Sequence, residues 1–213
     1  MRSPVPAIVL GLLAVFAAAS PMPVPDDGPN INIDPAQVWV EQITYAGSGC
    51  KAGSTWIFVN PTSLTFAFEA YTATIGPGIP FVERRKNCAI SFKIHYPAGY
   101  TFTLFKVDYY GRLRLDGGIK ATQQSQYWFP PNPPPPPLTS SWDGPRPEQV
   151  YHITDLVTSS VWAPCGTGTS ENLNVNTQVY LDNTNNPGGT GTITTDLVDL
   201  RAKTIYSFQW RTC

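Results

Sequence analysis

The sequence predicts an all-β fold: a two-sheet antiparallel β-sandwich of jelly-roll-like form, held by two disulfides. Three observations predict it. From Val38 onward, short runs rich in Val, Ile, Thr, Tyr, Phe and Trp recur, separated by Gly, Pro and Asn clusters, as in proteins built from many short strands. No window keeps a helical period, apart from one possible turn at 83–86. Four cysteines follow an N-terminal export signal, a combination that indicates a disulfide-bonded extracellular protein.

The first element is a signal peptide at residues 1–19. Arg2 precedes an apolar run at 7–19 that ends in three alanines, the order expected of a charged start, a hydrophobic segment and a cleavage site. The run is shorter than the roughly 20 apolar residues of a membrane helix. We therefore expect a secreted, extracellular protein with no membrane partner. Prolines among Asp and Asn predict a flexible leader at 20–36, and 37–213 a single domain.

Alternating side chains identify the clearest strands. Cys88, Ile90 and Phe92 share one face of a segment whose other face is polar, and residues 206–211 alternate in the same way, which indicates half-buried strands. The Gly-rich turns at 116–118 and 186–189 favour hairpins. The expected strands are 37–45, 54–60, 63–74, 88–96, 100–109, 112–116, 119–128, 149–156, 175–182, 190–198 and 203–211.

A polyproline run interrupts the strands at 130–137. Such a run adopts the stiff polyproline II conformation and is expected to project from the domain as an arm. Two interpretations remain open. The run is either a rigid loop insertion, which we favour, or a docking segment for an aromatic groove on a partner.

The cysteines are Cys50, Cys88, Cys165 and Cys213, and they allow three pairings. We favour Cys50–Cys88 with Cys165–Cys213, each worth about 4 kcal/mol if loop-closure entropy is the source. Cysteine order alone leaves the other two pairings open. With no Cys-x-x-Cys pair and only two histidines, zinc-site spacing is absent, and we expect neither a metal nor another cofactor.

Charge and motifs exclude several functional classes. The net charge is −1, so the chain lacks the basic excess that nucleic acid binding needs. Charged residues make up 14% of the chain, against about 25% in ordinary soluble domains. No serine-hydrolase elbow of the Gly-x-Ser-x-Gly form occurs, and we predict no catalytic residue from the sequence. We expect a monomer.

Five charged residues remain as candidates for ligand binding. Glu69, Glu83 and Asp108 lie in or beside expected strands. Two of them facing each other would resemble a glycosidase site, whereas the alternative is solvated carboxylates on strand faces. Arg84 and Arg85 precede Cys88. They would either grip a carboxylate or sulfate or pair with Glu83 or Asp108 to lock their loop, which is the reading we favour.

Several short strings of the chain form a recognisable set. They are Gly-Ser-Gly-Cys at 47–50, Ala-Tyr-Thr-Ala at 70–73, Gly-Pro-Gly at 76–78, Arg-Lys-Asn-Cys at 85–88, Tyr-Pro at 96–97, Trp-Ala-Pro-Cys-Gly at 162–166 and Gln-Trp-Arg-Thr-Cys at 209–213. This set resembles a secreted fungal family catalogued as domain of unknown function 4360. The resemblance spans residues 43–213, with the polyproline run as an insertion. It implies a small exported protein that acts at a cell wall or on a host surface, and it supplies no catalytic residues.

Two functional hypotheses follow. The first is an extracellular binding protein of effector or wall-associated type, whose partner is a cell-wall polysaccharide or a host surface component. The second is a secreted enzyme with a carboxylate-based site in a cleft of the sandwich, either a glycosidase or a non-hydrolytic isomerase or cyclase. The absence of a catalytic motif favours the first.

Overall fold

The computed structural model describes residues 33–60, 63–157, 162–168, 170–195 and 204–213. The predicted signal peptide and most of the predicted leader lie outside these residues, as does the end of the strand expected at 190–198. Within the described part of the chain, no helix is long and apolar enough to cross a membrane. Two short 3-10 helices occur, η1 (Pro35–Gln37) and η2 (Phe81–Arg84), the second close to the helical turn expected at 83–86.

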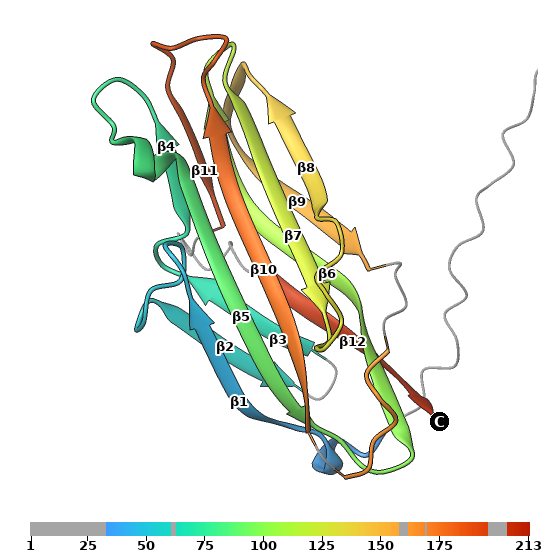
Figure 1. Ribbon diagram of the computed structural model, residues 1–213. Coiled ribbons are helices and arrows are strands. Elements are labelled where there is room, and N and C mark those ends of the chain that lie inside the picture. Colours follow the sequence, from blue (N-terminus) through green and yellow to red (C-terminus); the bar gives the residue numbers. More distant parts are fainter. Residues whose placement is uncertain (1–32, 61–62, 158–161, 169, 196–203) are drawn as a thin grey trace, which may run out of the picture.

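Two antiparallel sheets lie face to face and form a β-sandwich (Figure 1), which confirms the predicted fold class. Sheet A has the strand order β1-β5-β10-β7-β8, and sheet B has the order β2-β3-β12-β6-β11-β4, with β9 also paired to β6. The strands of sheet A are β1 (Trp39–Ala46), β5 (Arg85–His95), β7 (Lys120–Trp128), β8 (Leu138–Asp143) and β10 (Ser170–Asp182). Those of sheet B are β2 (Thr55–Asn60), β3 (Ser63–Phe68), β4 (Thr72–Ile75), β6 (Tyr100–Leu115), β9 (Arg146–Leu156), β11 (Gly191–Thr194) and β12 (Thr204–Thr212).

The interior between the sheets is aromatic. The rings of Phe66, Phe92 and Tyr206 meet edge to face, with centroids 5.4 to 5.7 Å apart, the arrangement that aromatic quadrupoles favour. Phe66 and Tyr206 come from sheet B, whereas Phe92 comes from sheet A. The apolar face expected on the segment from Cys88 onward is buried in this interior, as is that of β12.

The two Gly-rich turns do not form hairpins, contrary to our expectation. The turn at 116–118 leads from β6 in sheet B to β7 in sheet A, and the turn at 186–189 leads from β10 in sheet A to β11 in sheet B. They lie against each other at one end of the sandwich, where Asn186 Nδ2 donates to Gly117 O at 2.7 Å. Turn chemistry specifies a chain reversal, but it does not specify which sheet the chain enters next.

β6 is one long strand, although two strands were expected with a break near Gly111. A Cβ atom at Gly111 would lie 2.0 Å from the carbonyl oxygen of Thr194 and 2.5 Å from Tyr151 Oη. This glycine therefore allows the neighbouring strands to approach and does not mark a turn. β8, a strand that the sequence analysis missed, is a short polar segment at the edge of sheet A.

The polyproline segment closes the hairpin between β7 and β8, which pair directly. Most of the segment is exposed to solvent. Gln126 Nε2 on β7 donates to Pro135 O at 2.7 Å, so the segment is fastened back onto the sheet and does not stand out as a free arm.

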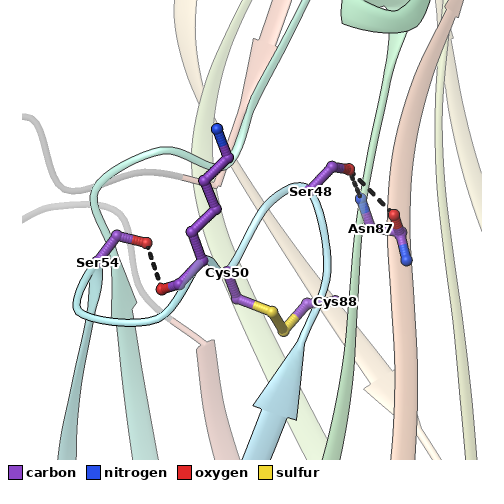
Figure 2. The surroundings of a disulfide bond; sticks show 6 residues. Ser48, Cys50, Ser54, Asn87 and Cys88 are labelled. Carbon is purple, nitrogen blue, oxygen red and sulfur yellow. Dashed lines mark hydrogen bonds between the residues drawn. A yellow bond between two sulfur atoms is a disulfide. The ribbon is translucent and has the colours of Figure 1, made fainter.

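Two disulfides brace the sandwich. Cys50 in the loop after β1 is bonded to Cys88 on β5, with a Cα–Cα distance of 5.5 Å. Both residues are fully buried. Beside this bond, Ser48 Oγ donates to Asn87 Oδ1 at 3.0 Å and accepts from the Asn87 backbone N–H at 3.1 Å (Figure 2). Cys165 is bonded to Cys213, with a Cα–Cα distance of 5.9 Å, and both of these residues are exposed.

Candidate functional site

The outer face of sheet A carries a row of carboxamide side chains. On β10, the inward residues Leu173, Val175, Thr177 and Val179 are buried, whereas the residues that alternate with them are partly or fully exposed. Because neighbouring side chains of a strand point to opposite faces, the amides of β10 form one line on the outer surface. That line consists of Asn172, Asn174, Asn176 and Gln178.

Neighbouring strands widen this row. Gln178 on β10 is directly opposite Gln124 on β7, and Gln126 is opposite Asn176. Gln178 Nε2 donates to Gln124 Oε1, and Gln124 Nε2 donates to Thr139 Oγ1 on β8 at 3.3 Å. These bonds position the Gln124 and Gln178 side chains in the absence of a ligand. We call this surface, formed by the outward residues of β5, β10 and β7, the amide face.

Two hollows lie on the amide face. The larger has a volume of about 630 Å³, and its lining includes Gln124, Gln178 and Tyr180. The smaller has a volume of about 360 Å³, and its lining includes Trp128 and Asn174. Asn174 and Tyr180 lie six residues apart on β10, which corresponds to about 20 Å along a strand. The amide face therefore offers an elongated surface with a hollow near each end.

Partly exposed aromatic rings line both hollows. Trp128 lines the smaller one and Tyr180 the larger one. Beyond the smaller hollow, Trp39 on β1 stacks on the ring of His95 on β5, with centroids 3.7 Å apart and planes 17° apart. Flat aromatic surfaces are thus spaced along the same face that carries the amides.

His95 also contacts a serine and a carboxylate, which invites comparison with a catalytic triad. Ser170 Oγ lies 3.4 Å from His95 Nδ1, and Glu41 Oε1 lies 3.6 Å from the same nitrogen. A triad needs the two groups on opposite ring nitrogens, one to orient the ring and one to lose its proton. Glu41 is instead held by Lys93 at 2.8 Å, whose hydrogen bond lowers the pKa of the carboxyl. The arrangement does not activate a nucleophile.

Of the candidate residues near Cys88, Glu83 forms an ion pair, whereas Arg84 and Arg85 line a hollow. Lys86 Nζ lies 2.6 Å from Glu83 Oε2, and this bond lowers the pKa of the Glu83 carboxyl. Arg84 and Arg85 both line the larger hollow of the amide face. Neither pairs with Glu83 or Asp108, so the loop-locking reading that we favoured is wrong. Arg84 ends η2 and Arg85 begins β5, three residues earlier than expected, and both lie in the lining of this concave surface.

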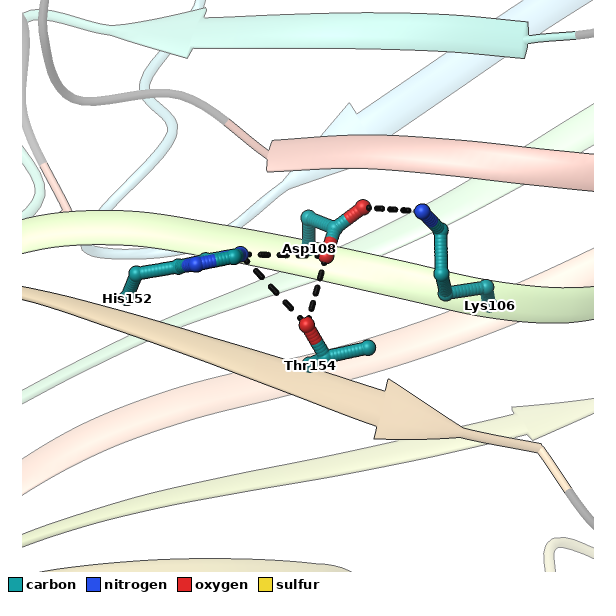
Figure 3. A network of polar contacts seen from close by, with 4 residues as sticks. All are labelled: Lys106, Asp108, His152 and Thr154. Carbon is teal, nitrogen blue, oxygen red and sulfur yellow. Dashed lines mark hydrogen bonds and ion pairs between the residues drawn. The ribbon is translucent and has the colours of Figure 1, made fainter.

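Asp108 lies on the outer face of the other sheet, in the network of Figure 3. Its carboxylate accepts from Thr154 Oγ1 at 2.7 Å and lies 3.1 Å from both Lys106 Nζ and His152 Nε2. Burial acts to raise the pKa of Asp108, but these three partners lower it overall. The ring of Tyr110 stacks on His152, with centroids 4.2 Å apart. The network ties β6 to β9.

Among the residues that the structure describes, the other candidate carboxylates do not complete a glycosidase pair. Glu69 is exposed in the bend after β3, on a different element from Glu83 and from Asp108. Asp155 points into the core at 9% exposure and accepts from Ser125 Oγ and Tyr127 Oη. Burial raises its pKa, and the two hydrogen bonds offset only part of that effect. Glu69, Glu83 and Asp108 therefore do not share one cleft.

The amides on the outer face of β10 were not predicted from the sequence. The segment from 172 to 180 alternates amide and aliphatic residues through most of its length, a pattern that predicts a polar outer face. The strand was expected to start at 175 but starts at Ser170, so half of the pattern was assigned to a loop. Among the described residues, no group of three or more His, Cys, Asp or Glu side chains is placed to hold a metal ion.

Comparison with solved structures finds weak likenesses to two carbohydrate-binding modules. One is TmCBM61 in complex with β-1,4-galactotriose, with a TM-score of 0.24, 10% identity, and coverage of 79% of this chain and 88% of that one. The other is the family 11 module of Clostridium thermocellum in complex with a β-1,3-1,4-mixed-linked tetrasaccharide, with a TM-score of 0.26, 9% identity, and coverage of 85% and 93%. At these TM-scores the likenesses say nothing about a ligand.

Sequence relatives are more informative. An uncharacterized secreted protein of the fungus Arthroderma benhamiae is 35% identical over 192 residues, which cover 89% of this chain and 77% of the relative. The chain, like this relative, is secreted. The family model described as domain of unknown function DUF4360 matches residues 36–213, so that the match includes every strand of both sheets. The chain belongs to the DUF4360 family.

Proposed function

We propose that this secreted protein binds a cell-wall polysaccharide through the amide face of sheet A, and that it acts by binding without catalysis. The observation that carries the proposal is the row of outward amides on β10 and β7, flanked by two hollows that each contain an aromatic ring.

Amides suit a hydroxyl-rich ligand. Each carboxamide presents two donors and one acceptor, and each sugar hydroxyl can both donate and accept, so one row of amides matches many hydroxyls without any net charge. Exposed aromatic rings add flat apolar surfaces against which the apolar faces of sugar rings pack. A surface that binds polymers must also be long and open, as this one is.

The enzyme hypothesis receives no comparable support. Asp182 is the one carboxylate residue among those lining the two hollows described above, and its Oδ1 accepts from the Thr184 backbone N–H at 2.8 Å. A carboxylate glycosidase needs a second carboxyl group about 5–10 Å away across the bond to be cleaved. The partner is therefore proposed as a ligand and not as a substrate.

The test is retention of the purified chain on insoluble chitin, β-glucan, cellulose and pectin, followed by titration with soluble fragments of whichever polymer retains it. Trp128→Ala should raise Kd about tenfold, equivalent to about 1.4 kcal/mol, because an aromatic contact is lost. Trp56→Ala is the matched control, since Trp56 is 47% exposed on β2 of the other sheet. Retention on none of the polymers, or weakening by Trp56→Ala alone, would count against the proposal.

A further inference from the structure

We propose that the larger hollow of the amide face receives the carboxylate of an acidic sugar, so that the ligand is a uronate-containing polysaccharide. This inference rests on the proposed function and deepens it. Its basis is the pair of guanidinium groups, Arg84 and Arg85, in the lining of a hollow that also contains amides, hydroxyls, two aromatic rings and one carboxylate, Asp182.

The charge of this hollow is not balanced from within. Lys86 forms an ion pair with Glu83. In the part of the chain that the structure describes, neither arginine forms an ion pair. Arg85 is exposed. Asp182 contributes one negative charge to the lining, so the two arginines leave a net positive charge. An anionic group on the ligand would restore neutrality.

Arg84 is held in position by neutral groups. Its Nη1 donates to Asn183 Oδ1 at 3.2 Å, and its guanidinium lies 4.9 Å from the ring centroid of Phe81. A cation over an aromatic face is weakly attracted to it, and the contact leaves the charge available to a ligand. With Arg84 fixed and Arg85 open to solvent, the hollow combines a pre-ordered cation with an adaptable one.

Two features favour a sugar carboxylate over a free anion. The planar guanidinium fork of Arg85 matches the two oxygens of a carboxylate. Gln124 and Gln178 are hydrogen-bonded to each other and line the same hollow with Tyr180. They supply hydrogen-bond partners for the hydroxyls of the sugar ring that carries the carboxylate. Asp182 disfavours a second negative charge, which points to one carboxylate in the hollow.

The experiment is calorimetric titration of the full chain with oligogalacturonate, with the same oligomer as its neutral methyl ester, and with neutral β-glucan fragments. We expect the free acid to bind about tenfold more tightly than the ester, and the difference to shrink as salt is added. Arg85→Gln should abolish the preference while leaving binding of the ester intact. Arg85→Lys, which keeps the charge but not the fork, should restore only part of it.

Arg114→Gln is the matched control, because Arg114 is exposed on β6 of the other sheet and the change in net charge is the same. It should leave the preference unchanged. Equal binding of acid and ester by the wild type, or stronger binding of a sulfated glycan than of the uronate, would overturn the inference. If neutral fragments bind but acid gives no advantage, the inference fails and the proposed function stands. If nothing binds, both fail.

Discussion

Gly49 is placed against the ring of Tyr71, and replacing it with alanine should destabilise the protein. A Cβ atom at this position would lie 2.3 Å from Tyr71 Cδ2 and 2.6 Å from Cε2, whereas carbon atoms in contact normally stay about 3.5–4.0 Å apart. Neither partner is free to withdraw. Tyr71 is 1% exposed and packs edge to face on Phe68, with centroids 5.1 Å apart. The Gly49 backbone N–H donates to Asn87 O at 2.9 Å.

The expected loss of stability follows from these contacts. An overlap of more than an ångström in a closed site belongs at the upper end of overpacking costs, about 3 kcal/mol. The lower chain entropy of alanine in the unfolded state returns about 0.4–1 kcal/mol. Gly49→Ala should therefore lower the free energy of unfolding by about 2–2.5 kcal/mol, measured by urea denaturation with the disulfides intact and with an unchanged m-value.

Gly188→Ala is the control, because no atom lies within 4 Å of the Cβ that it would add. It should be neutral or stabilising by about 0.4–1 kcal/mol. The pair of Gly49→Ala and Tyr71→Ala should show a coupling energy of at least about 1 kcal/mol, since removal of the ring removes the overlap. Stability of Gly49→Ala within about 0.5 kcal/mol of wild type, or strict additivity with Tyr71→Ala, would refute the close-approach explanation.

Two further predictions concern buried chemistry. Burial raises the pKa of Asp155 in the folded state, so the neutral carboxyl adds to the stability of the protein at low pH, and this contribution is lost as the pH rises through the folded-state pKa. Asp155→Asn should therefore gain stability relative to wild type as the pH is raised from 3 to 7. A difference in urea midpoints that does not change with pH would contradict this. The exposed bond Cys165–Cys213 should be reduced under native conditions before the fully buried Cys50–Cys88, as alkylation and peptide mapping would show; simultaneous reduction would contradict it.

The main features of the fold were predictable because they depend on local pattern. The alternation around Phe92 and along 206–211 places apolar side chains on one face of a strand, and burial of that face requires a second sheet. β8 was not predicted because most of its residues are polar; it pairs with β7, and its Trp142 packs against the core beside Tyr151. β6 was predicted as two strands because a glycine such as Gly111 is typical of a strand end. Its actual role, to admit neighbouring strands, depends on contacts that the sequence does not show.

The candidate site was predictable only in part. Arg84 and Arg85 were singled out from the sequence because they lie in its densest charge cluster, but an anion clamp was the interpretation that we did not favour. The interpretation that we favoured, ion pairs of the two arginines with Glu83 or Asp108, depended on distances between side chains in the folded protein, which the local sequence does not determine. Glu83 forms an ion pair with Lys86, three residues away. Asp108 lies in sheet B, where its partners Lys106 and Thr154 also lie. The amide face depends on β10 lying between β5 and β7, a long-range arrangement.

By itself, the sequence determined that this protein is a secreted all-β domain with two disulfides, since the export signal, strand periodicity and cysteine count are each properties of short segments. The tertiary structure decided which cysteines are joined, which turns cross between the sheets, and which side chains share a surface. These outcomes depend on strand order, because residues far apart in the chain become neighbours only when their strands pair. Asn174, Gln124 and Arg85 lie on three strands, and pairing of those strands brings them onto one face.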